Sequence, residues 1–431
     1  MIAFSSRWPR IKQWTLRLAE FGFVQGLVQL LTAVAGLLVV RTLAKHEYAI
    51  YAIANSMQAT CNLLADVGIG IGVRSIGGRV WNDPARFGQL LNTTLGLRRR
   101  FAVVSLGVSL PLAAWMLWRN GATVPAIIGL CAVIVLAVIP LLGVTAWGTC
   151  AQLHGEYRRL QKLDFGNAMM RCALIGLLVL TKMNALLATS VGVVGNWVQV
   201  MFLRRWAHEK VHAAAPPNVE DRRELLRLSL KWLPNVVFYC LQGQVTLLIL
   251  TFFGNPTGVA DITALGRVAA LLTIFSVTFA NVLAPRFARC QEPARLPRLY
   301  LLLVGGTLAV LAPLVLCAWL FPAPLLWLLG GKYAGLKQEC GWIVAAGCVS
   351  QICSVMWSLN SSKAWIRLQS LALIPMVLGA QLFTAFCLDL RQFHNVVIFN
   401  LVSAAAFLPL NLADAYFGLK KSRLLLSERE T

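Results

Sequence analysis

Three charged residues lie inside apolar stretches of this 431-residue chain and could do chemistry there. Asp66 ends a long, mostly apolar run and is followed by the sequence GIGIG at 68–72. Arg171 and Arg267 each stand well inside another apolar run. A carboxylate in such surroundings can take up a proton or bind a cation, whereas a guanidinium can hold the oxygens of an anion such as phosphate. Each of the three therefore needs an element that positions it.

Motifs for other chemistries fail on their context. The sequence HEKVH at 208–212 has the spacing of zinc-protease ligands, but two prolines follow closely and no further histidine lies nearby in sequence. GIGIG lacks the spacing of a dinucleotide-binding loop, and the chain has no phosphate-binding P-loop. The eleven cysteines include no C-x-x-C pair. We therefore expect no catalytic residue, no metal site and no organic cofactor.

The composition predicts the kind of element that carries the three charges. Hydrophobic residues make up 58% of the chain and charged residues 13%, and the mean hydropathy is +0.69. A soluble domain of this size would need far more polar surface. The apolar residues come in blocks of about 20, long enough for a helix to cross a hydrocarbon core. The sequence predicts an all-α polytopic membrane protein, because a helix satisfies its backbone amides within one segment.

Twelve apolar blocks predict about 12 transmembrane helices. In chain order, the predicted spans cover residues 21–40, 48–73, 101–118, 123–147, 165–181, 185–203, 229–252, 260–284, 299–320, 341–361, 366–388 and 394–418. No cleavable signal is evident before the first span, which we expect to act as its own insertion signal.

The basic residues, which give a formal net charge of +22, follow a pattern along these spans. If the N-terminus is cytoplasmic, 30 of the 39 Lys and Arg residues fall in cytoplasmic segments and 7 in external loops. This is the positive-inside pattern of membrane proteins. It predicts cytoplasmic N- and C-termini, and it explains the charge better than nucleic-acid binding does.

Residues 204–228 form the longest polar stretch and divide the spans into two sets of six. We therefore predict an N-terminal lobe at 1–203, a basic cytoplasmic linker at 204–228 and a C-terminal lobe at 229–431. A weak internal echo supports the division, since EYAIYAIANS at 47–56 opens the second span and GVADITALGR at 258–267 opens the eighth. Two six-helix halves of one topology are typical of transporters that open a cavity to one side at a time.

Three blocks carry a more specific pattern. They are VVRTLAKHEYAIYAIANSMQATCNLLADVGIGIGVRS, ITALGRVAALLTIFSVTFANVLAPRFARC and PLLWLLGGKYAGL. In this order they resemble polysaccharide flippases of the MOP exporter superfamily. The matching positions are Glu47, Tyr48, Tyr51, Leu64, Ala65, Asp66 and Gly68, then Arg267, Pro285, Arg286 and Ala288, then Leu329, Gly330, Tyr333 and Ala334.

The resemblance implies a MATE-like (MOP) fold of two six-helix lobes, and a transporter rather than an enzyme. The implied cargo is an oligosaccharide on a polyprenyl pyrophosphate. The protein would flip it by alternating access to the outer leaflet of a bacterial inner membrane, for surface polysaccharide synthesis. The implied partners are this lipid-linked oligosaccharide, membrane lipids and polysaccharide assembly enzymes. The resemblance implies no cofactor. It is compatible with coupling of transport to H+ or Na+.

Five residues are candidates for binding or coupling in such a transporter. Arg267, Arg171 and Lys231 are the predicted substrate-binding residues, and snorkelling to the membrane edge is the alternative for each. Asp66 is either a structural anion, bonded to a neighbouring helix end or a cytoplasmic arginine, or an acid that couples transport to a cation. Asp414, late in the twelfth span, has the same two alternatives.

Other functions stay open from the sequence. A multidrug or cation antiporter of the same superfamily would need an acidic cavity, whereas the charges placed deepest in this sequence are arginines. A non-transporting membrane scaffold with the same fold is the alternative from another class. An integral-membrane glycosyltransferase is disfavoured, because no loop carries the paired carboxylates of a metal site.

Overall fold

The computed structural model describes residues 8–181, 183–211, 215–253, 255–270, 295–363, 365 and 367–430, with a few single positions between 271 and 294. Every regular element in this part of the chain is a helix. The predicted all-α fold is therefore confirmed. The helices form two compact units. We call residues 23–260 the first unit, and residues 261–431 together with 1–22 the second unit.

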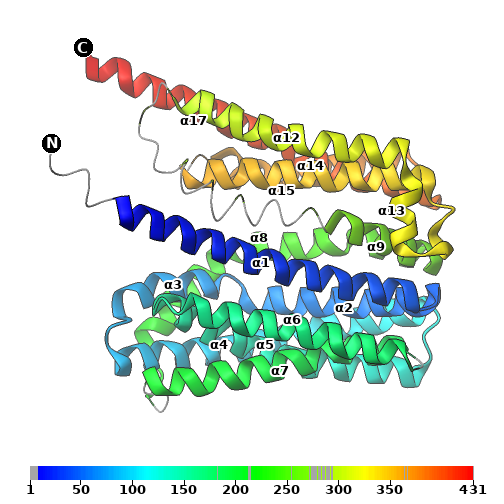
Figure 1. Ribbon diagram of the computed structural model, residues 1–431, viewed down its shortest axis with the longest axis horizontal. Coiled ribbons are helices and arrows are strands. Elements are labelled where there is room, and N and C mark those ends of the chain that lie inside the picture. Colours follow the sequence, from blue (N-terminus) through cyan, green and yellow to red (C-terminus); the bar gives the residue numbers. More distant parts are fainter. Residues whose placement is uncertain are drawn as a thin grey trace. The chain divides into compact units, whose positions relative to one another are not determined.

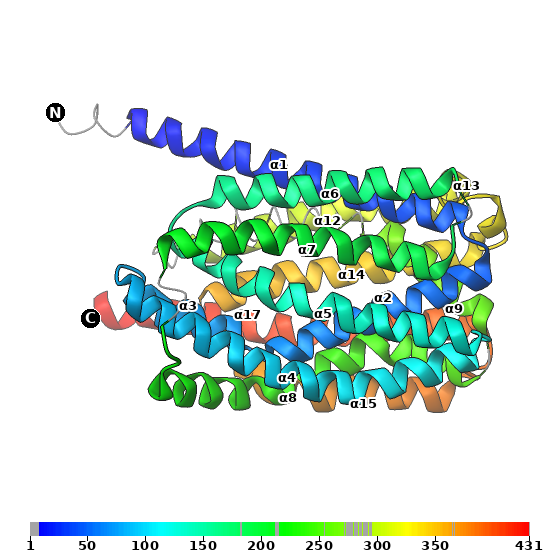
Figure 2. The same cartoon turned by 90° about the horizontal axis from the view of Figure 1, so that it is seen from below.

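The first unit contains the longest helices of the chain. Their bounds are α1 Trp8–Thr42, of which residues 23–42 belong to this unit, α2 Lys45–Asp66, α3 Ile69–Val80, α4 Pro84–Arg119, α5 Val124–Leu153, α6 Tyr157–Val179, α7 Ala185–Lys210 and α8 Val219–Phe252. Within the unit, α5 packs on α7 and α2 packs on α4 (Figures 1 and 2). The side chains of Asp83 and Asn184 accept hydrogen bonds from the first turns of α4 and α7, which fixes where these helices begin.

The second unit is built around α14. Its elements are α12 Leu296–Leu320, α13 Pro322–Leu329, the 3₁₀ turn η2 Gly331–Tyr333, α14 Lys337–Ser362, α15 Arg367–Cys387, α16 Phe393–Ala405 and α17 Phe407–Glu430. Helix α9, Pro256–Ala270, begins in the first unit and continues into the second. α14 packs on α12, α16 and α17, and α15 packs on α17 (Figure 1).

Eight helices among the described residues have the length and apolar composition to cross a membrane. They are Phe23–Thr42, Pro84–Arg119, Val124–Leu153, Ala185–Lys210, Leu233–Phe252, Leu296–Leu320, Lys337–Ser362 and Phe393–Lys420. Of the other predicted spans, 48–73 is divided between α2 and α3, 165–181 lies in α6, and the apolar part of 366–388 is Leu371–Cys387. Most of residues 271–284 in the predicted span 260–284, and the matching positions Pro285, Arg286 and Ala288, lie outside the described residues.

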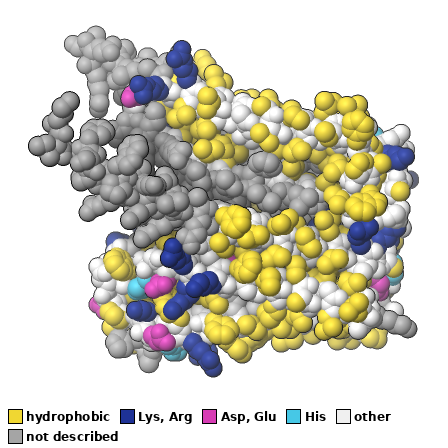
Figure 3. Space-filling model, viewed as in Figure 1, with side chains coloured by type: hydrophobic (Ala, Val, Ile, Leu, Met, Phe, Trp, Pro, Cys, Tyr) yellow, Lys and Arg dark blue, Asp and Glu magenta, His cyan; other side chains and the backbone are white. Residues whose placement is uncertain are grey.

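The surface of the described helices is apolar along their middle. On the face seen in Figure 3, hydrophobic side chains cover the central part of the helices, while charged side chains gather toward the ends of the first unit. Large apolar residues such as Leu301 and Phe386 are 70% and 93% exposed. A surface of this kind is stable against lipid and not against water, so the structure supports a multi-pass membrane protein.

The predicted second span breaks between Asp66 and Ile69. Val67 and Gly68 have φ angles of 32° and 72°, so both adopt left-handed backbone, and the chain then starts the new helix α3. Glycine tolerates this conformation, whereas a buried β-branched residue such as Val67 is held in it against its preference. Gly72 has a different role, since it permits α3 to pack closely on α8. A Cβ at this position would lie 2.6 Å from Leu225 Cδ2 of α8.

The predicted linker at 204–228 is largely helical. α7 continues to Lys210, and α8 starts at Val219 under a cap in which the Asn218 side chain accepts from two backbone amides. Because α7 ends at Lys210, the HEKVH spacing does not lie on one continuous helix, and His212 falls outside the described residues. Within the described part of the chain, no group of three metal-binding side chains occurs.

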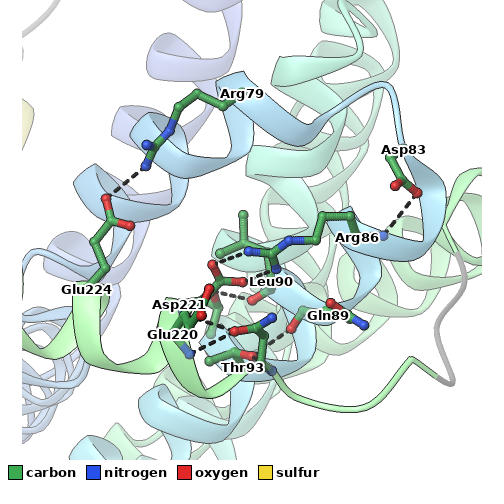
Figure 4. Close-up of polar contacts among 11 residues, drawn as sticks. Arg79, Asp83, Arg86, Gln89, Leu90, Thr93, Glu220, Asp221 and Glu224 are labelled. Atoms are coloured by element: carbon green, nitrogen blue, oxygen red, sulfur yellow. Dashed lines mark hydrogen bonds and ion pairs between the residues drawn. The ribbon is translucent and has the colours of Figure 1, made fainter.

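Ion pairs join the start of α8 to α3 and α4 (Figure 4). Both terminal guanidinium nitrogens of Arg86 on α4 donate to the carboxylate of Asp221 on α8, Nη2 to Oδ1 at 2.7 Å. Asp221 is buried. The exposed Arg79 of α3 binds Glu224 of α8 at 2.8 Å. The labelled side chains in Figure 4 thus come from α3, α4 and the N-cap Asp83 on one side and from α8 on the other.

The opposite end of α8 is also bonded to α4. Arg119 donates to the carbonyl oxygen of Phe252 at 3.1 Å, and Asn120 Nδ2 donates to Thr251 Oγ1 at 3.1 Å. These bonds at both ends explain why α8 is part of a compact unit that continues to Ala260. The predicted division into two lobes of six helices each stays a prediction.

Candidate functional site

A polar pocket of about 230 Å³ lies inside the first unit, lined mainly by α2, α6 and α7. Its polar lining residues are Tyr51, Asn55, Gln58, Asn62, Arg171, Thr189 and Asn196. The four on α2 are spaced three or four residues apart, which places them on one face of the helix. Their hydroxyl and amide groups can both donate and accept hydrogen bonds, so the pocket suits a ligand rich in hydroxyl groups.

Arg171 is the one charged residue among the described residues that line this pocket. It is half-buried on α6, and no described residue forms a hydrogen bond or an ion pair with its guanidinium. Gly192 on α7 lies beside it, and a Cβ there would be 3.6 Å from Arg171 Nη2, which is an ordinary contact distance. A half-buried guanidinium whose N–H groups have no protein acceptor is available to an anionic ligand, and its planar fork matches phosphate oxygens.

A chain of side-chain hydrogen bonds links α6 and α7 beside the pocket. Asn167 Nδ2 donates to Gln199 Oε1 at 2.9 Å and to Asn196 Oδ1 at 3.4 Å. Gln199 Nε2 in turn donates to Asp164 Oδ1 at 2.7 Å. The chain fixes the orientation of the Asn196 amide, which lines the pocket, so one wall is arranged before any ligand arrives.

Asn62 adds an unsatisfied acceptor to the pocket. Its Oδ1 is buried and accepts no hydrogen bond from the described residues. Buried acceptors in native proteins nearly always have a partner, so one in a pocket is typically met by water or by a ligand. Asn62 therefore adds a polar side chain to the lining beside Arg171, while its Oδ1 atom is itself enclosed by protein.

Asp66 is paired with an arginine that nothing in the sequence analysis singles out. Arg98 of α4 is only 2% exposed, and its Nη2 donates to Asp66 Oδ1. Its Nη1 donates to Thr145 Oγ1 and, at 3.4 Å, to the Leu142 carbonyl oxygen, both on α5. Gly70 lets the carboxylate lie against the start of α3, because a Cβ there would be 3.2 Å from Asp66 Oδ2. This is the bond that the structural alternative for Asp66 requires, while a coupling role stays a prediction.

A signal for Arg98 does exist in the sequence. The residue stands first in a run of three arginines, which suggests a cytoplasmic helix end. Yet small or hydroxylated residues recur at its helical spacing, at Thr94, Ala102, Ser105 and Ser109, and all of them are buried in the structure. A face of small residues on an apolar helix is typical of close helix packing, and Arg98 shares that face.

The other predicted site residues have different surroundings. Asp414 is buried and accepts a hydrogen bond from Leu368 N at 2.8 Å, so its carboxylate lies at the start of α15. Lys231 is exposed on α8 and does not line the Arg171 pocket. Arg267 is half-buried in the last turn of α9, in the second unit. The roles predicted for these three residues stay predictions.

Gln244, another polar residue of a predicted span, joins α8 to α2. Its Nε2 donates to Ser56 Oγ at 2.6 Å and to Thr60 Oγ1 at 2.8 Å, and the side chain is buried. Ser56 follows Asn55 directly, so adjacent faces of α2 make the contact with α8 and line the pocket. The bond therefore helps to hold α2 in the orientation that the pocket requires.

Comparison with known proteins identifies the arrangement of helices. An inward-facing structure of a multidrug resistance MATE family transporter of the MOP superfamily matches 93% of this chain and 95% of its own, with 15% identity and a TM-score of 0.67. The eukaryotic MATE transporter AtDTX14 matches 94% and 99%, with 11% identity and a TM-score of 0.58. This chain has the MATE fold. A MATE structure in complex with MaD3S agrees, with 17% identity over 94% and 95% and a TM-score of 0.56.

The MATE fold is what the sequence resemblance implied, and that expectation is confirmed. No protein-family profile and no curated protein sequence matches the chain. At 11–17% identity the likeness concerns the fold alone. The residues of the Arg171 pocket are therefore the observations that bear on what this chain binds.

Proposed function

We propose that this protein is a MOP-type transporter that flips a polyprenyl-pyrophosphate-linked oligosaccharide from the cytoplasmic to the outer leaflet by alternating access. The observation that carries the proposal is the Arg171 pocket. The Arg171 guanidinium has no partner among the described residues, and amide and hydroxyl groups line the pocket around it. None of the described lining residues is acidic.

The chemistry of such a cargo fits these groups. The pyrophosphate is anionic and accepts charge-assisted hydrogen bonds from a guanidinium. Sugar hydroxyls both donate and accept, as the amides of Asn55, Gln58 and Asn62 do. Neither part crosses hydrocarbon unaided, because unpaired polar groups and charges cost several kcal/mol each there. A polar, cationic pocket between helices would lower that cost.

The proposed transporter lies in a bacterial inner membrane with both of its termini in the cytoplasm. The distribution of Lys and Arg along the chain favours cytoplasmic N- and C-termini, and the resemblance to polysaccharide flippases favours a bacterial inner membrane. Arg267 and Lys231 would assist binding of the anionic head. Asp66 or Asp414 would couple transport to H+ or Na+, and each would have to exchange its present bond, to Arg98 or to Leu368 N, for the cation.

The same pocket disfavours two alternatives, a multidrug or cation antiporter and a scaffold without transport. One of the similar structures is a multidrug resistance transporter. A pocket for a cationic drug would be expected to present a carboxylate, whereas the described lining of the Arg171 pocket presents a guanidinium. A scaffold without transport would have no use for an unpaired, half-buried charge, which is costly to retain.

The deciding experiment measures lipid-linked sugar in a strain that lacks the protein. The leaflet is assigned by accessibility of the sugar to an impermeant lectin added to intact spheroplasts. We expect lipid-linked oligosaccharide to accumulate on the inner leaflet and the surface polymer to be lost. Complementation with the unmodified chain should restore both, whereas Arg171→Gln should not.

The alternatives give other results. Normal lipid-linked sugar with intact surface polymer would exclude the flippase, and faster accumulation of cationic dyes in the deletion strain would then indicate the antiporter. Full complementation by Arg171→Gln would exclude the pocket as the binding site. If the scaffold were correct, the surface polymer would be affected without any change in the leaflet distribution.

A further inference from the structure

A second, larger pocket lies on another side of the first unit, between α4, α5 and α7. Its volume is about 620 Å³, and it shares no lining residue with the Arg171 pocket. Each helix contributes one face, as the spacing of Asn92, Leu95 and Arg99 along α4 shows. The function proposed above makes no use of this pocket.

One end of this pocket is basic. Arg99, Arg204 and His208 line it, all three are exposed, and no acidic residue is among its described lining residues. Arg204 Nε donates to His208 Nε2 at 3.3 Å, which orients the guanidinium and leaves its terminal nitrogens available. Arg99 forms no hydrogen bond or ion pair with the described residues. Two exposed guanidinium groups on one pocket form a site for an anion.

Apart from Asn92, whose Nδ2 donates to the Ala215 carbonyl oxygen, the remainder of the pocket is apolar, and it is open to the side. Ile139 and Met201 line it and are 50% and 57% exposed. Its inner wall is closed by tight packing, because a Cβ on Gly143 of α5 would overlap Val200 Cγ2 of α7. A ligand that fills both parts must therefore have an anionic head and a hydrocarbon tail.

The depth of the basic end matches the membrane interface. Arg204 lies six residues before α7 ends at Lys210, which is roughly 9 Å along the helix axis. Trp147 and Trp197 also line the pocket, and the rings of Trp147 and His208 are 5.8 Å apart. Tryptophan is enriched at the level of lipid headgroups, and basic pockets between transmembrane helices on the cytoplasmic side bind anionic headgroups.

We propose that this pocket binds one anionic phospholipid of the cytoplasmic leaflet, with its phosphate on Arg99 and Arg204 and an acyl chain along Val200 and Met201. The leaflet follows from the positive-inside orientation. The lipid would act as a bound structural ligand of α4, α5 and α7. The site is separate from the cargo pocket, so the inference does not depend on the flippase proposal.

The test uses the full-length protein in a non-ionic detergent, titrated with dioleoyl phosphatidylglycerol. Native mass spectrometry counts bound lipid, and the thermal unfolding midpoint reports its effect on stability. We expect one tightly held phosphatidylglycerol and a higher midpoint, with no such effect of phosphatidylcholine or of sodium phosphate. Arg99→Gln with Arg204→Gln should weaken binding about 30-fold, from about 1 kcal/mol per basic residue and tenfold per 1.4 kcal/mol.

A matched control removes the same charge beside the pocket. Arg100 and Arg205 are the sequence neighbours of the two arginines, are exposed, and do not line the pocket. Their double exchange to glutamine should leave phosphatidylglycerol binding unchanged, and Arg99→Lys with Arg204→Lys should retain most of it. Equal weakening in both glutamine pairs would reveal only diffuse attraction and overturn the site. Equal stabilisation by sodium phosphate would overturn the lipid as its ligand.

Discussion

Two arginines of the first unit show how a charge inside a membrane protein can be used. Arg98 is buried and donates to a carboxylate, a hydroxyl and a carbonyl group, so its charge is compensated within the fold. Arg171 is half-buried and receives no such bonds from the described residues. Because a buried charge is costly without a partner, we expect loss of Arg98 bonding to reduce stability and loss of Arg171 to reduce function.

Arg171→Gln should reduce transport at least tenfold, which corresponds to about 1.4 kcal/mol of lost interaction with the anionic head. The thermal unfolding midpoint should change little, because no described protein group depends on this guanidinium. Transport is measured by the leaflet assay, and protein amount by immunoblot of the membrane fraction. Arg171→Lys as active as the unmodified chain would argue against a bidentate phosphate contact.

Asp66→Ala should destabilise the first unit by about 3 kcal/mol, because it leaves Arg98 buried without its anion. The double variant Asp66→Ala with Arg98→Met should recover most of the loss, since it removes both charges. Thermal unfolding of the purified variants in detergent measures both effects. A fully stable Asp66→Ala protein that no longer transports would instead favour the coupling role of Asp66.

At the scale of the elements, glycine positions decide where helices break and where they meet. α2 and α3 are separated by two left-handed residues, and the start of α3 carries Gly70 against the Asp66 carboxylate. Gly72 brings α3 close to Leu225 of α8, and α8 is held at the same end by Asp221. Backbone conformation and ion pairs therefore act together to position Asp66.

Gly68→Ala should destabilise the protein by about 1 kcal/mol, because alanine is disfavoured at a φ of 72°. Gly78→Ala is the control within the helix that Gly68 precedes. It lies inside α3, and a Cβ there would contact nothing within 4 Å, so alanine should be neutral or stabilise by about 0.5 kcal/mol. Thermal unfolding compares the two, and equal midpoints would contradict the left-handed break.

Asp221→Asn and Glu224→Gln break the two ion pairs that join α8 to α4 and α3. The side chains of Asp221 and Glu224 are 3% and 46% exposed, so the carboxylate of the first pair is buried and that of the second is solvated. We expect a loss of about 3 kcal/mol for Asp221→Asn and less than about 1 kcal/mol for Glu224→Gln. Hydrogen exchange of residues 219–228 should rise only in the first variant. Equal exchange in both would mean that burial does not decide the anchoring of α8.

At the scale of the whole molecule, the apolar helices and the distribution of basic residues determine how the chain lies in a bilayer. The α4–α5 connection is poor in Lys and Arg, whereas the connection between α5 and α6 is followed by Arg158 and Arg159. The positive-inside rule predicts that the first connection lies outside and the second inside.

Thr123→Cys and Tyr157→Cys test this orientation, because both residues are exposed and flank opposite ends of α5. In intact spheroplasts, a membrane-impermeant maleimide should label the first variant well above the unmodified chain and leave the second at the level of the unmodified chain. Permeabilised cells should show labelling of both. The reverse pattern in intact cells would invert the topology and the proposed direction of transport.

The sequence by itself determined the class of the protein and most of its helices. Hydropathy and length are sums over neighbouring residues, so the apolar blocks predicted an all-α membrane protein without knowledge of any contact. The order of the motifs also indicated the MOP-type fold that the similar structures share. The break at Val67 was not predictable in this way, because a valine carries no sign of left-handed backbone.

Only the tertiary structure decided which charges are paired. Asp66 and Arg98 are 32 residues apart, and Arg86 and Asp221 are 135 apart. Their pairing depends on which faces of separate helices meet, and no local pattern records that. The same holds for Arg171, since Asn55, Asn62 and Asn196 reach its pocket from other helices. The sequence of a single span predicts that an arginine is buried. The packing of the neighbouring helices decides whether its guanidinium bonds to protein groups or is available to a ligand.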